Sequence, residues 1–397
     1  MHAIYIISII LISIGVTLFL LSFIFEYTRK QNLKKRTVKD YAIIIPARNE
    51  SKVIKNLLDS IKLQNPNMDN VYVIVEDKKD ETVKIVKEYG GNIYVRKNIE
   101  NRRRKGYALD ECLKDILKKK HYDLYFIMDA DNILGKNFIN EMLKTYKKGY
   151  DIATSYRNIK NSSNIISSCS GLTFSFMNTL FNEYNNHMHK SMIISGTGFY
   201  ISGELVEKLN GYPFHSLTED YELTLYAEAN NISSYYNKNA IFYDEQPTKM
   251  KDSIKQRTRW VKGFLEARKI RLKDIKDDYS KLMGIIPYLF IIIGIAILLI
   301  SNFGLSIHYL ITSNNLFFTT FKSFINILLV VYLILAALTF YVILKENNKL
   351  NMSLKYKILS CLYNPIFLST YIYCFIKALV TKNVAWEEIK HEKTQID

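Results

Sequence analysis

The chain has 397 residues, of which 48 % are hydrophobic and 13 % aromatic, and this content excludes a disordered chain because enough apolar surface can be buried to offset the entropy of ordering. The four cysteines lie far apart, which excludes a zinc module and a small disulfide-stapled domain. The net charge of +16 leaves nucleic acid, an anionic membrane surface or a phosphate-bearing substrate as partners.

The N-terminal region begins with an uncharged run over residues 3–25, long enough to cross a hydrocarbon core of roughly 30 Å as a helix. It lacks the basic start and the small-residue cleavage site of a signal peptide. Residues 26–40 then contain six basic and two acidic side chains, a net +4, which by the positive-inside rule places the following chain in the cytoplasm. The sequence therefore predicts a transmembrane helix over residues 1–26 and a basic juxtamembrane segment over residues 27–40.

Residues 41–250 alternate short β-rich runs with helical patterns, as in an α/β domain. Strands are predicted over residues 41–45, 71–75, 92–95 and 124–128, and helices over residues 51–63, 80–89, 107–119 and 136–147. This order predicts a mostly parallel sheet with helices on both faces. Ligands bind such sheets at the carboxyl ends of the strands, so the residues after each strand are candidate binding residues.

Acidic residues follow two of these strands. Glu76 and Asp77 end the second strand, where a carboxylate can accept hydrogen bonds from a base or a ribose, whereas Asp80 is better explained as a cap of the next helix. Asp129 and Asp131 follow the fourth strand. In an extended segment both carboxylates would point to one side and could hold a divalent cation together with substrate phosphates, but a simple turn or helix cap is the alternative.

Basic residues dominate residues 96–105, which carry six basic side chains and one acidic one ahead of Gly106 and a helix. The segment is either an anion site at a helix N-terminus or a solvated loop. Further along, Thr218 is a candidate helix cap, which leaves Glu219 and Asp220 free to act as a base. The pair His187 and His189 is interpreted as part of a polar loop.

The C-terminal part combines an amphipathic pattern with apolar runs. Residues 251–280 are predicted to form an interfacial helix, in which Trp260 is a membrane anchor or a platform for a sugar ring. Residues 281–397 are predicted to form a transmembrane region and tail, with apolar runs over residues 283–300, 324–344 and 358–380. The third run contains Asn364, Pro365 and Lys377, so a kinked span, a re-entrant hairpin and an interfacial helix stay open, as does the side on which the chain ends.

The order of seven short motifs is more specific than any one of them. They are Ile-Pro-Ala-Arg-Asn-Glu at 45–50, Val-Glu-Asp-Lys-Lys-Asp-Glu-Thr at 75–82, Arg-Lys-Gly-Tyr-Ala-Leu-Asp at 104–110, Asp-Ala-Asp-Asn at 129–132, Gly-Thr-Gly at 196–198, Leu-Thr-Glu-Asp at 217–220 and Gln-Arg-Thr-Arg-Trp at 256–260. From residue 41 to about residue 263, with the flanking apolar runs, the chain resembles the family 2 glycosyltransferases. Within that family it resembles the processive, cellulose-synthase-like membrane enzymes that make exopolysaccharides.

This resemblance implies a GT-A-like fold, a cofactor of Mg²⁺ or Mn²⁺, a UDP-sugar donor and a polysaccharide or glycolipid acceptor at the membrane lipid. It implies that Asp220 is the general base, with Glu219 beside it, and that Asp129 and Asp131 hold the metal. Glu76 stands where relatives usually have Asp, which leaves open whether Glu76 or Asp77 makes the contact. The remaining implied contacts are Pro46, Arg48, Glu50, Lys105, Gln256 and Arg259 for the nucleotide sugar, and Gly196, Thr197, Gly198 and Trp260 for the acceptor.

The expected function is therefore that of a membrane-embedded glycosyltransferase with its catalytic domain in the cytoplasm, extending a polysaccharide. One base and no evident carboxylate nucleophile predict inversion at the anomeric carbon. The alternatives are transfer of a single sugar to a lipid carrier or glycolipid, and a non-catalytic membrane protein that binds anionic lipid. Nucleic acid is excluded because the basic clusters flank apolar runs or a strand end and form no single basic face.

Overall fold

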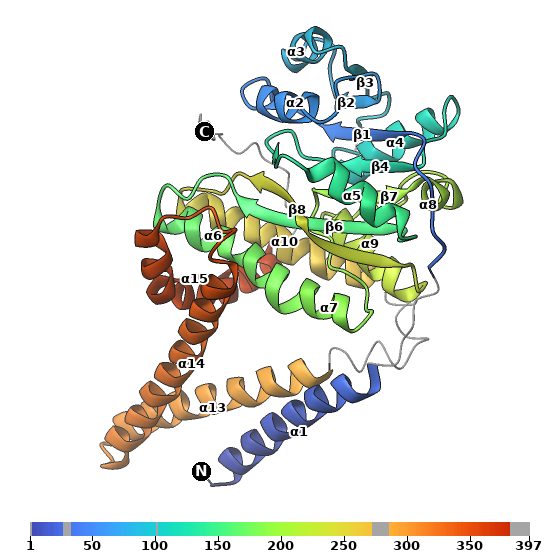
Figure 1. The fold of residues 1–397 in the computed structure, drawn as a ribbon. Coiled ribbons are helices and arrows are strands. Elements are labelled where there is room, and N and C mark those ends of the chain that lie inside the picture. Colours follow the sequence, from blue (N-terminus) through green and yellow to red (C-terminus); the bar gives the residue numbers. More distant parts are fainter. Residues whose placement is uncertain (1, 27–32, 101, 272–285, 382–397) are drawn as a thin grey trace.

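The computed structural model describes residues 2–26, 33–100, 102–271 and 286–381 (Figure 1). A sheet covered by helices forms a globular part, and long apolar helices extend from it. The eight strands are β1 (Tyr41–Pro46), β2 (Val71–Val75), β3 (Asn92–Val95), β4 (Leu124–Ile127), β5 (Ile133–Leu134), β6 (Ile152–Ile159), β7 (Phe199–Ser202) and β8 (Ser234–Asp244).

All eight strands belong to one sheet, in the order β3-β2-β1-β4-β7-β6-β8-β5. Strands β1 to β4 pair in parallel, as do β6 and β8, whereas β7 runs antiparallel to both β4 and β6. The predicted mostly parallel α/β sheet is thus confirmed. The second and third predicted strands have the observed bounds, and the first and fourth differ by one residue at the carboxyl end.

Both faces of the sheet are buried. In β1, Ile43 and Ile45 pack with α2 (Ile54–Lys62) and α5 (Phe138–Lys147), while Ala42 and Ile44 pack with α4 (Lys105–Leu117) on the other face. This alternation follows from the pleat, which turns successive side chains to opposite faces. Burial on both faces explains why these strands are almost continuously apolar in sequence.

The remaining helices of the globular part surround this sheet. They are α3 (Thr82–Glu88), α6 (Ile165–Phe176), the π-helix η1 (Met177–Asn182), α7 (Glu183–His187), α8 (Gly203–Lys208), α9 (Glu219–Ala229) and α10 (Met250–Ile270). The four predicted helices are present, with their first residues shifted by two or three positions. The predicted helix over residues 251–280 corresponds to α10, which ends at Ile270, and residues 272–280 lie outside the described residues.

Two predicted helix caps have different outcomes. Asp80 Oδ1 accepts a hydrogen bond from the Thr82 amide at 2.9 Å, as the capping interpretation requires. Thr218 occupies the N-cap position of α9, but its side chain makes no capping hydrogen bond there. It faces Gly263 of α10, where an added Cβ would lie 2.4 Å from Thr218 Cγ2. Thr218 therefore provides a tight helix contact in place of the predicted cap.

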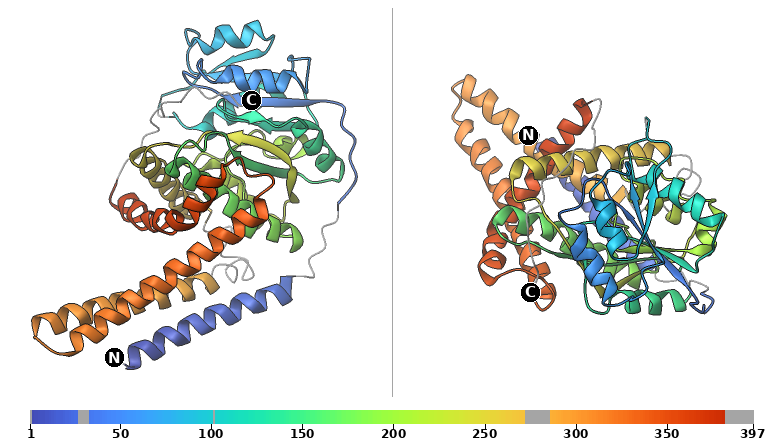
Figure 2. Two further views of the ribbon diagram at one scale, coloured as in Figure 1. Left: turned by 60° about the vertical axis from the view of Figure 1, so that its left-hand side comes forward. Right: turned by 90° about the horizontal axis from the view of Figure 1, so that it is seen from above.

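Four long apolar helices complete the described chain. They are α1 (His2–Glu26), α13 (Ile286–Ile311), α14 (Leu316–Glu346) and α15 (Leu354–Val380). Helices α1, α13 and α14 lie side by side and extend away from the sheet (Figure 2), whereas α15 lies beside α6 and α10. By length and composition, Ile293–Ile311, Leu316–Glu346 and Leu354–Val380 could cross a membrane, whereas the apolar part found in α1, Ala3–Leu18, is shorter. The N-terminal membrane span therefore stays a prediction.

Candidate active site

The candidate site lies at the carboxyl ends of β1, β2 and β4, beside the N-terminus of α4. At its centre is Lys105, the first residue of α4. Its Nζ lies 2.5 Å from Asp129 Oδ1, 2.6 Å from the carbonyl oxygen of Gly196 and 3.9 Å from Glu219 Oε1. Burial tends to lower the pKa of Lys105, but Asp129, Glu219 and Asp220 raise it overall. Lys105 thus joins three sequence-predicted segments that are far apart in the chain.

The segment with Asp129 and Asp131 forms a turn. The Asn132 amide donates to the Asp129 carbonyl at 3.2 Å, so the extended arrangement is wrong and the turn alternative is confirmed. The turn is held on both sides, because the Asp129 amide donates to Thr197 Oγ1 at 2.8 Å and Lys160 Nζ donates to the Asp131 carbonyl at 3.1 Å. These bonds fix the backbone of the turn, with Asp129 beside the Gly-Thr-Gly segment.

Asp220 lies on the other side of that segment, in the first turn of α9. Gly196 has a φ of +79°, and a Cβ there would lie 3.3 Å from Asp220 Oδ2, so the carboxylate faces the bare backbone. Burial raises the pKa of Asp220, while Lys105, Arg157 and Arg259 act in the opposite direction. Burial also raises the pKa of Glu219, against the opposing effect of Lys105. A carboxylate whose pKa is raised toward neutrality is suited to act as a general base.

Gly198 has a different function from Gly196. A Cβ at Gly198 would lie 2.2 Å from Phe242 Cε1, so this glycine allows close packing of the loop on β8. Gly196 instead leaves space beside Asp220. The interpretation of the motif as close packing is confirmed at Gly198, while approach to a ligand at Gly196 stays a prediction.

Arg157 is a buried cation that sequence reasoning missed. It lies on β6 and donates from Nη1 to the Ser195 carbonyl at 2.7 Å and from Nη2 to Asp244 Oδ2 at 2.6 Å. Asp244 Oδ1 in turn accepts a hydrogen bond from Asn132 Nδ2 at 2.8 Å. This network joins the loop before Gly196 to the Asp129–Asp131 turn. The available signal was weak, because Arg157 stands among Thr154, Ser155 and Asn158 on β6 and local spacing does not reveal its distant carboxylate partner.

The nucleotide side of the site is formed after β1 and β2. Glu76 Oε2 lies 3.3 Å from Arg48 Nε, and Glu76 Oε1 lies 3.8 Å from Arg96 Nη1. Asp77 is exposed, and its carboxylate accepts the Lys79 amide at 2.9 Å within a local turn. Glu76 is thus held by two arginines, while Asp77 is engaged by its own backbone.

Neighbouring predicted contacts occupy the same edge. Pro46 is the last residue of β1, and the Glu50 amide donates to Thr82 Oγ1 at 3.2 Å.

The basic segment over residues 96–105 divides between the two interpretations, because Arg102 and Arg103 are exposed whereas other basic side chains pair with carboxylates. Arg104 Nη1 bonds Glu266 Oε1 at 2.7 Å, and Lys97 Nζ contacts Asp115. Arg96 lies 3.8 Å from both Glu76 and Glu111. Long-range pairing with carboxylates, which a local charge count does not detect, thus accounts for Arg96, Lys97 and Arg104. Lys105 lies at the N-terminus of α4, and anion binding there stays a prediction.

Residues of the Gln-Arg-Thr-Arg-Trp run point in different directions from α10. Trp260 packs edge-on against Phe174 of α6, with ring centroids 5.7 Å apart, and Arg259 acts on the pKa of Asp220. Gln256 Oε1 is buried without a hydrogen-bond partner among the described residues. Arg257 is fully buried against α15. Arg259 thus acts on the candidate site, Trp260 faces α6, and Arg257 faces α15.

The described residues contain no group of three or more His, Cys, Asp or Glu that could hold a metal ion. His187 is the last residue of α7, so the interpretation of this segment as a loop is wrong at His187, whereas His189 follows the helix. Two carboxylates, Asp129 and Asp131, suit a hard cation whose other ligands are phosphate oxygens and water, as is usual for Mg²⁺ bound with a nucleotide. The donor set therefore fits Mg²⁺ or Mn²⁺.

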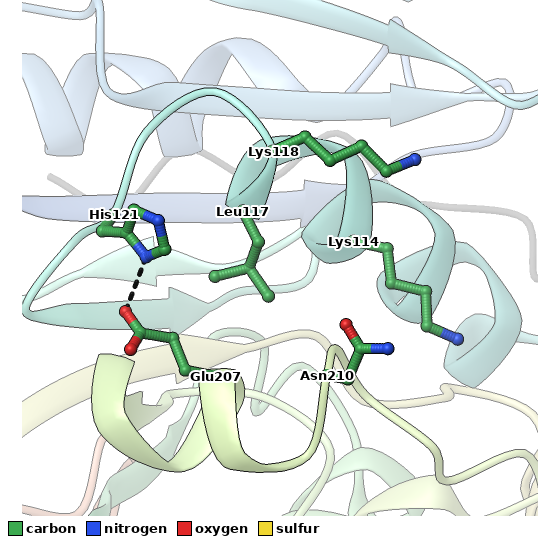
Figure 3. A pocket seen from close by; sticks show the side chains of 6 residues that line it. All are labelled: Lys114, Leu117, Lys118, His121, Glu207 and Asn210. Carbon is green, nitrogen blue, oxygen red and sulfur yellow. Dashed lines mark hydrogen bonds and ion pairs between the residues drawn. The ribbon is translucent and has the colours of Figure 1, made fainter.

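A surface opening of about 430 Å³ lies elsewhere, between α4 and α8 (Figure 3). It lies at the opposite end of α4 from Lys105, near His121, which precedes β4. His121 Nδ1 is 2.7 Å from Glu207 Oε1 there. The opening is therefore separate from the candidate site. Its lining residues are Lys114, Leu117, Lys118, His121, Glu207 and Asn210.

Comparison with known proteins agrees with this geometry. Residues 39–263 match the family model described as glycosyltransferase like family 2. The chain belongs to this family. It is 24 % identical over 241 residues to the probable glycosyltransferase YdaM of Bacillus subtilis, covering 59 % of this chain and 57 % of YdaM. The match is to the family as a whole, so the processive subgroup stays a prediction.

Two further similarities differ in extent. The UDP-N-acetylglucosamine–dolichyl-phosphate N-acetylglucosaminyltransferase of Methanococcus voltae is 50 % identical over 46 residues, which cover 12 % of this chain and 18 % of that protein. The structure of a mannosyltransferase from Pyrobaculum calidifontis with GDP-Man and Mn²⁺ has a TM-score of 0.54 at 15 % identity, covering 96 % of this chain and 100 % of the other. The chain therefore has a GT-A-like α/β fold with three apolar C-terminal helices.

Proposed function

We propose that this chain transfers a sugar from a UDP-sugar to an acceptor hydroxyl, with inversion, at the cytoplasmic face of a membrane. The observation that carries the proposal is the convergence of Asp129, Lys105, Gly196 and Asp220. Lys105 Nζ contacts both the Asp129 carboxylate and the Gly196 carbonyl, and the carboxylate of Asp220, the candidate base, faces Gly196. The match spans 57 % of the length of YdaM and 18 % of the length of the dolichyl-phosphate enzyme, so the proposed activity rests on this geometry together with the family.

Donor binding is assigned to the strand-end residues. Glu76, held by Arg48 and Arg96, accepts hydrogen bonds from the uracil or the ribose. Lys105, Gln256 and Arg259 bind the diphosphate, whose negative charge grows as the sugar leaves. A divalent cation held by Asp129 and Asp131 would supply further charge stabilisation to the same leaving group.

Asp220 is assigned as the general base. The acceptor hydroxyl must lose its proton as its oxygen attacks the anomeric carbon, and a carboxylate within reach accepts that proton. Gly196 has no side chain beside Asp220 Oδ2, and we assign that place to the acceptor. Trp260 is assigned as an aromatic platform for an acceptor sugar ring. One displacement by one hydroxyl inverts the anomeric carbon.

The acceptor is proposed to be a growing polysaccharide, supported by the Gln-Arg-Thr-Arg-Trp run on α10. A lipid-linked acceptor is the second candidate, supported by the 46-residue similarity to the dolichyl-phosphate enzyme. Product length separates the two, because repeated addition gives long products and single addition gives one short glycolipid.

The test uses purified full-length protein with a panel of UDP-sugars and GDP-mannose, in the presence of Mg²⁺ or Mn²⁺. Nucleotide release and product length are measured. We expect Asp220→Asn to lower the rate by about 10²–10⁴-fold while UDP binding is retained, because only proton removal is lost. The control Asp69→Asn changes an exposed carboxylate just before β2, at the opposite edge of the sheet, and should leave transfer unchanged. Wild-type transfer by Asp220→Asn would exclude this base.

A further inference from the structure

We propose that α15 lies along the membrane surface and does not cross the bilayer. Its outer apolar face contacts lipid, and the chain leaves α15 on the same side as the globular part. The proposal depends on α13 and α14 as membrane helices and is independent of sugar transfer. The sequence leaves open a kinked span, a re-entrant hairpin and an interfacial helix for residues 358–380, and the proposal selects the interfacial helix.

The first end of α15 is fixed to the globular part. Tyr356, in the first turn of the helix, donates from its hydroxyl to the Ser163 carbonyl at 2.7 Å. Just ahead of the helix, Asn351 Nδ2 donates to the carbonyl of Ile159, the last residue of β6, at 2.8 Å. This end of α15 therefore lies beside the end of a central strand.

The other end of α15 is fixed to the same part. Lys262 Nζ of α10 donates to the carbonyl oxygens of Ala378 and Thr381, at 3.1 and 2.9 Å. The next residue, Gly263, packs onto Thr218 at the start of α9. The second end thus lies close to the helix that carries Asp220.

Contacts with the globular part continue between the two ends. Arg257 of α10 donates to Thr370 Oγ1 at 2.7 Å, and the Cys374 thiol lies 3.7 Å from the Ile254 carbonyl. With 27 residues, α15 is about 40 Å long, more than the roughly 30 Å of a hydrocarbon core. A helix of this length that crossed the core would have its ends on opposite sides. Because both ends touch one folded unit, α15 runs along its surface.

The side chains of α15 form two stripes on opposite sides of the helix, one facing the globular part and one facing outward. Residues on the inner stripe are buried, and those on the outer stripe are large, apolar and about half exposed or more. The buried stripe contains Ser360, Asn364, Phe367, Cys374 and Ala378, and the exposed stripe contains Ile358, Leu362, Ile366, Tyr373, Ile376 and Val380. A continuous apolar face of this size is not stable in water and is typical of a helix in the lipid interface.

The surroundings of this face also favour lipid over a protein partner. Helix α14, with its own exposed apolar residues, packs against α15, so the two apolar surfaces are continuous. Asn364 Nδ2 of α15 donates to Thr339 Oγ1 of α14 at 3.0 Å. Lys355 and Lys357 lie at the start of α15, where lysines favour anionic headgroups. Figure 1 shows α14 extending away from the sheet while α15 stays beside α6 and α10.

The depth of the outer stripe tests the proposal. Single cysteines replace Ile358, Ile366 and Ile376 in full-length protein whose native cysteines are changed to serine, and nitroxide depth is measured in vesicles of phosphatidylethanolamine and phosphatidylglycerol. We expect similar shallow depths at all three positions. A crossing helix would separate the first and last by about 27 Å along the bilayer normal. Cysteines at Phe318, Leu329 and Leu344 of α14 give the graded profile of a crossing helix.

A second measurement decides the matter without the cysteine substitutions. A protease-cleavable tag is placed after Asp397, and a second cleavage site is inserted in the exposed turn at Lys78. We expect both sites to be cut in vesicles of one orientation, and both to be protected in sealed vesicles of the opposite orientation. Cleavage in vesicles of opposite orientation would overturn the proposal, whatever the outcome of the sugar-transfer assay.

Discussion

At the scale of single residues, the candidate base is governed by cations from three elements. Lys105 of α4, Arg157 of β6 and Arg259 of α10 all act to lower the pKa of Asp220, against the burial that raises it. Arg157 differs from the other two because it is buried and bonded to the Ser195 carbonyl and Asp244. It is therefore a positioning residue that also adjusts the proton affinity of the base.

Removing Arg157 should move the pH profile of transfer in a defined direction. Asp220 must be deprotonated to accept a proton, so the acid limb of kcat/KM follows its pKa. In Arg157→Met with Asp244→Asn, which avoids leaving a buried carboxylate unpaired, the loss of the cation raises that pKa and the acid limb moves to higher pH. The control Arg268→Met removes an exposed arginine that bonds the Tyr221 hydroxyl. An unchanged acid limb in the double variant would contradict the assignment.

The limits of sequence reasoning are visible at these residues. Lys105 and Asp220 were predicted because each lies in a short motif beside a helix start. Arg157 was not, because its carboxylate partner, Asp244, lies 87 residues further along the chain and no local spacing connects them. The proposed choice of Glu76 over Asp77 likewise rests on Arg48 and Arg96, whose pairing with Glu76 the sequence does not reveal.

At the scale of elements, the site depends on how closely α10 approaches the start of α9. A Cβ at Gly263 would lie 2.4 Å from Thr218 Cγ2 and 2.9 Å from the Thr218 backbone nitrogen. The absence of a side chain at Gly263 thus sets the distance between α10 and the first turn of α9. That turn contains Glu219 and Asp220, while α10 carries Arg259 and Trp260.

Gly263→Ala should therefore separate the two helices. We expect a loss of stability of about 1–3 kcal/mol from overpacking, seen as a lower Tm, together with a marked loss of transfer. The control Gly304→Ala adds the same methyl group to α13, where nothing lies within 4 Å of the new Cβ. Its Tm should be unchanged or slightly higher, because Ala favours a helix over Gly. Wild-type transfer by Gly263→Ala would show that this contact does not position the site.

The elements themselves were largely predictable, for a local reason. Residues 71–75 and 92–95 are β-rich runs followed by polar or basic residues, so their bounds agree with the observed strands. The Asp129–Asp131 turn and the end of α10 were less predictable. A turn depends on partners such as Thr197 and Lys160, which a strand-like extrapolation ignores. For α10, an amphipathic pattern indicates which face is buried, but it does not indicate the residue at which the helix ends.

At the scale of the whole molecule, the apolar helices and the catalytic part are mechanically connected. Apolarity and length predicted the three C-terminal helices, but they could not predict that one of them packs along the globular part. Buried polar contacts make that connection: Arg257 of α10 with Thr370, and Asn158 of β6 with the Lys349 carbonyl at 2.6 Å. The position of α10, and so of Arg259 and Trp260, thus depends on α15.

Arg257→Met should weaken that connection. The Arg257 guanidinium carbon lies 4.1 Å from the Phe367 ring centroid and 4.8 Å from that of Tyr371, and the side chain is fully buried. A desolvated cation–π contact contributes about 2 kcal/mol, so we expect a lower Tm, faster proteolysis near α15 and reduced transfer in membranes. The control Lys251→Met removes an exposed cation that lies on α10 more than one helix turn before Arg257. If both variants keep the same Tm and activity, α15 does not support the catalytic part through Arg257.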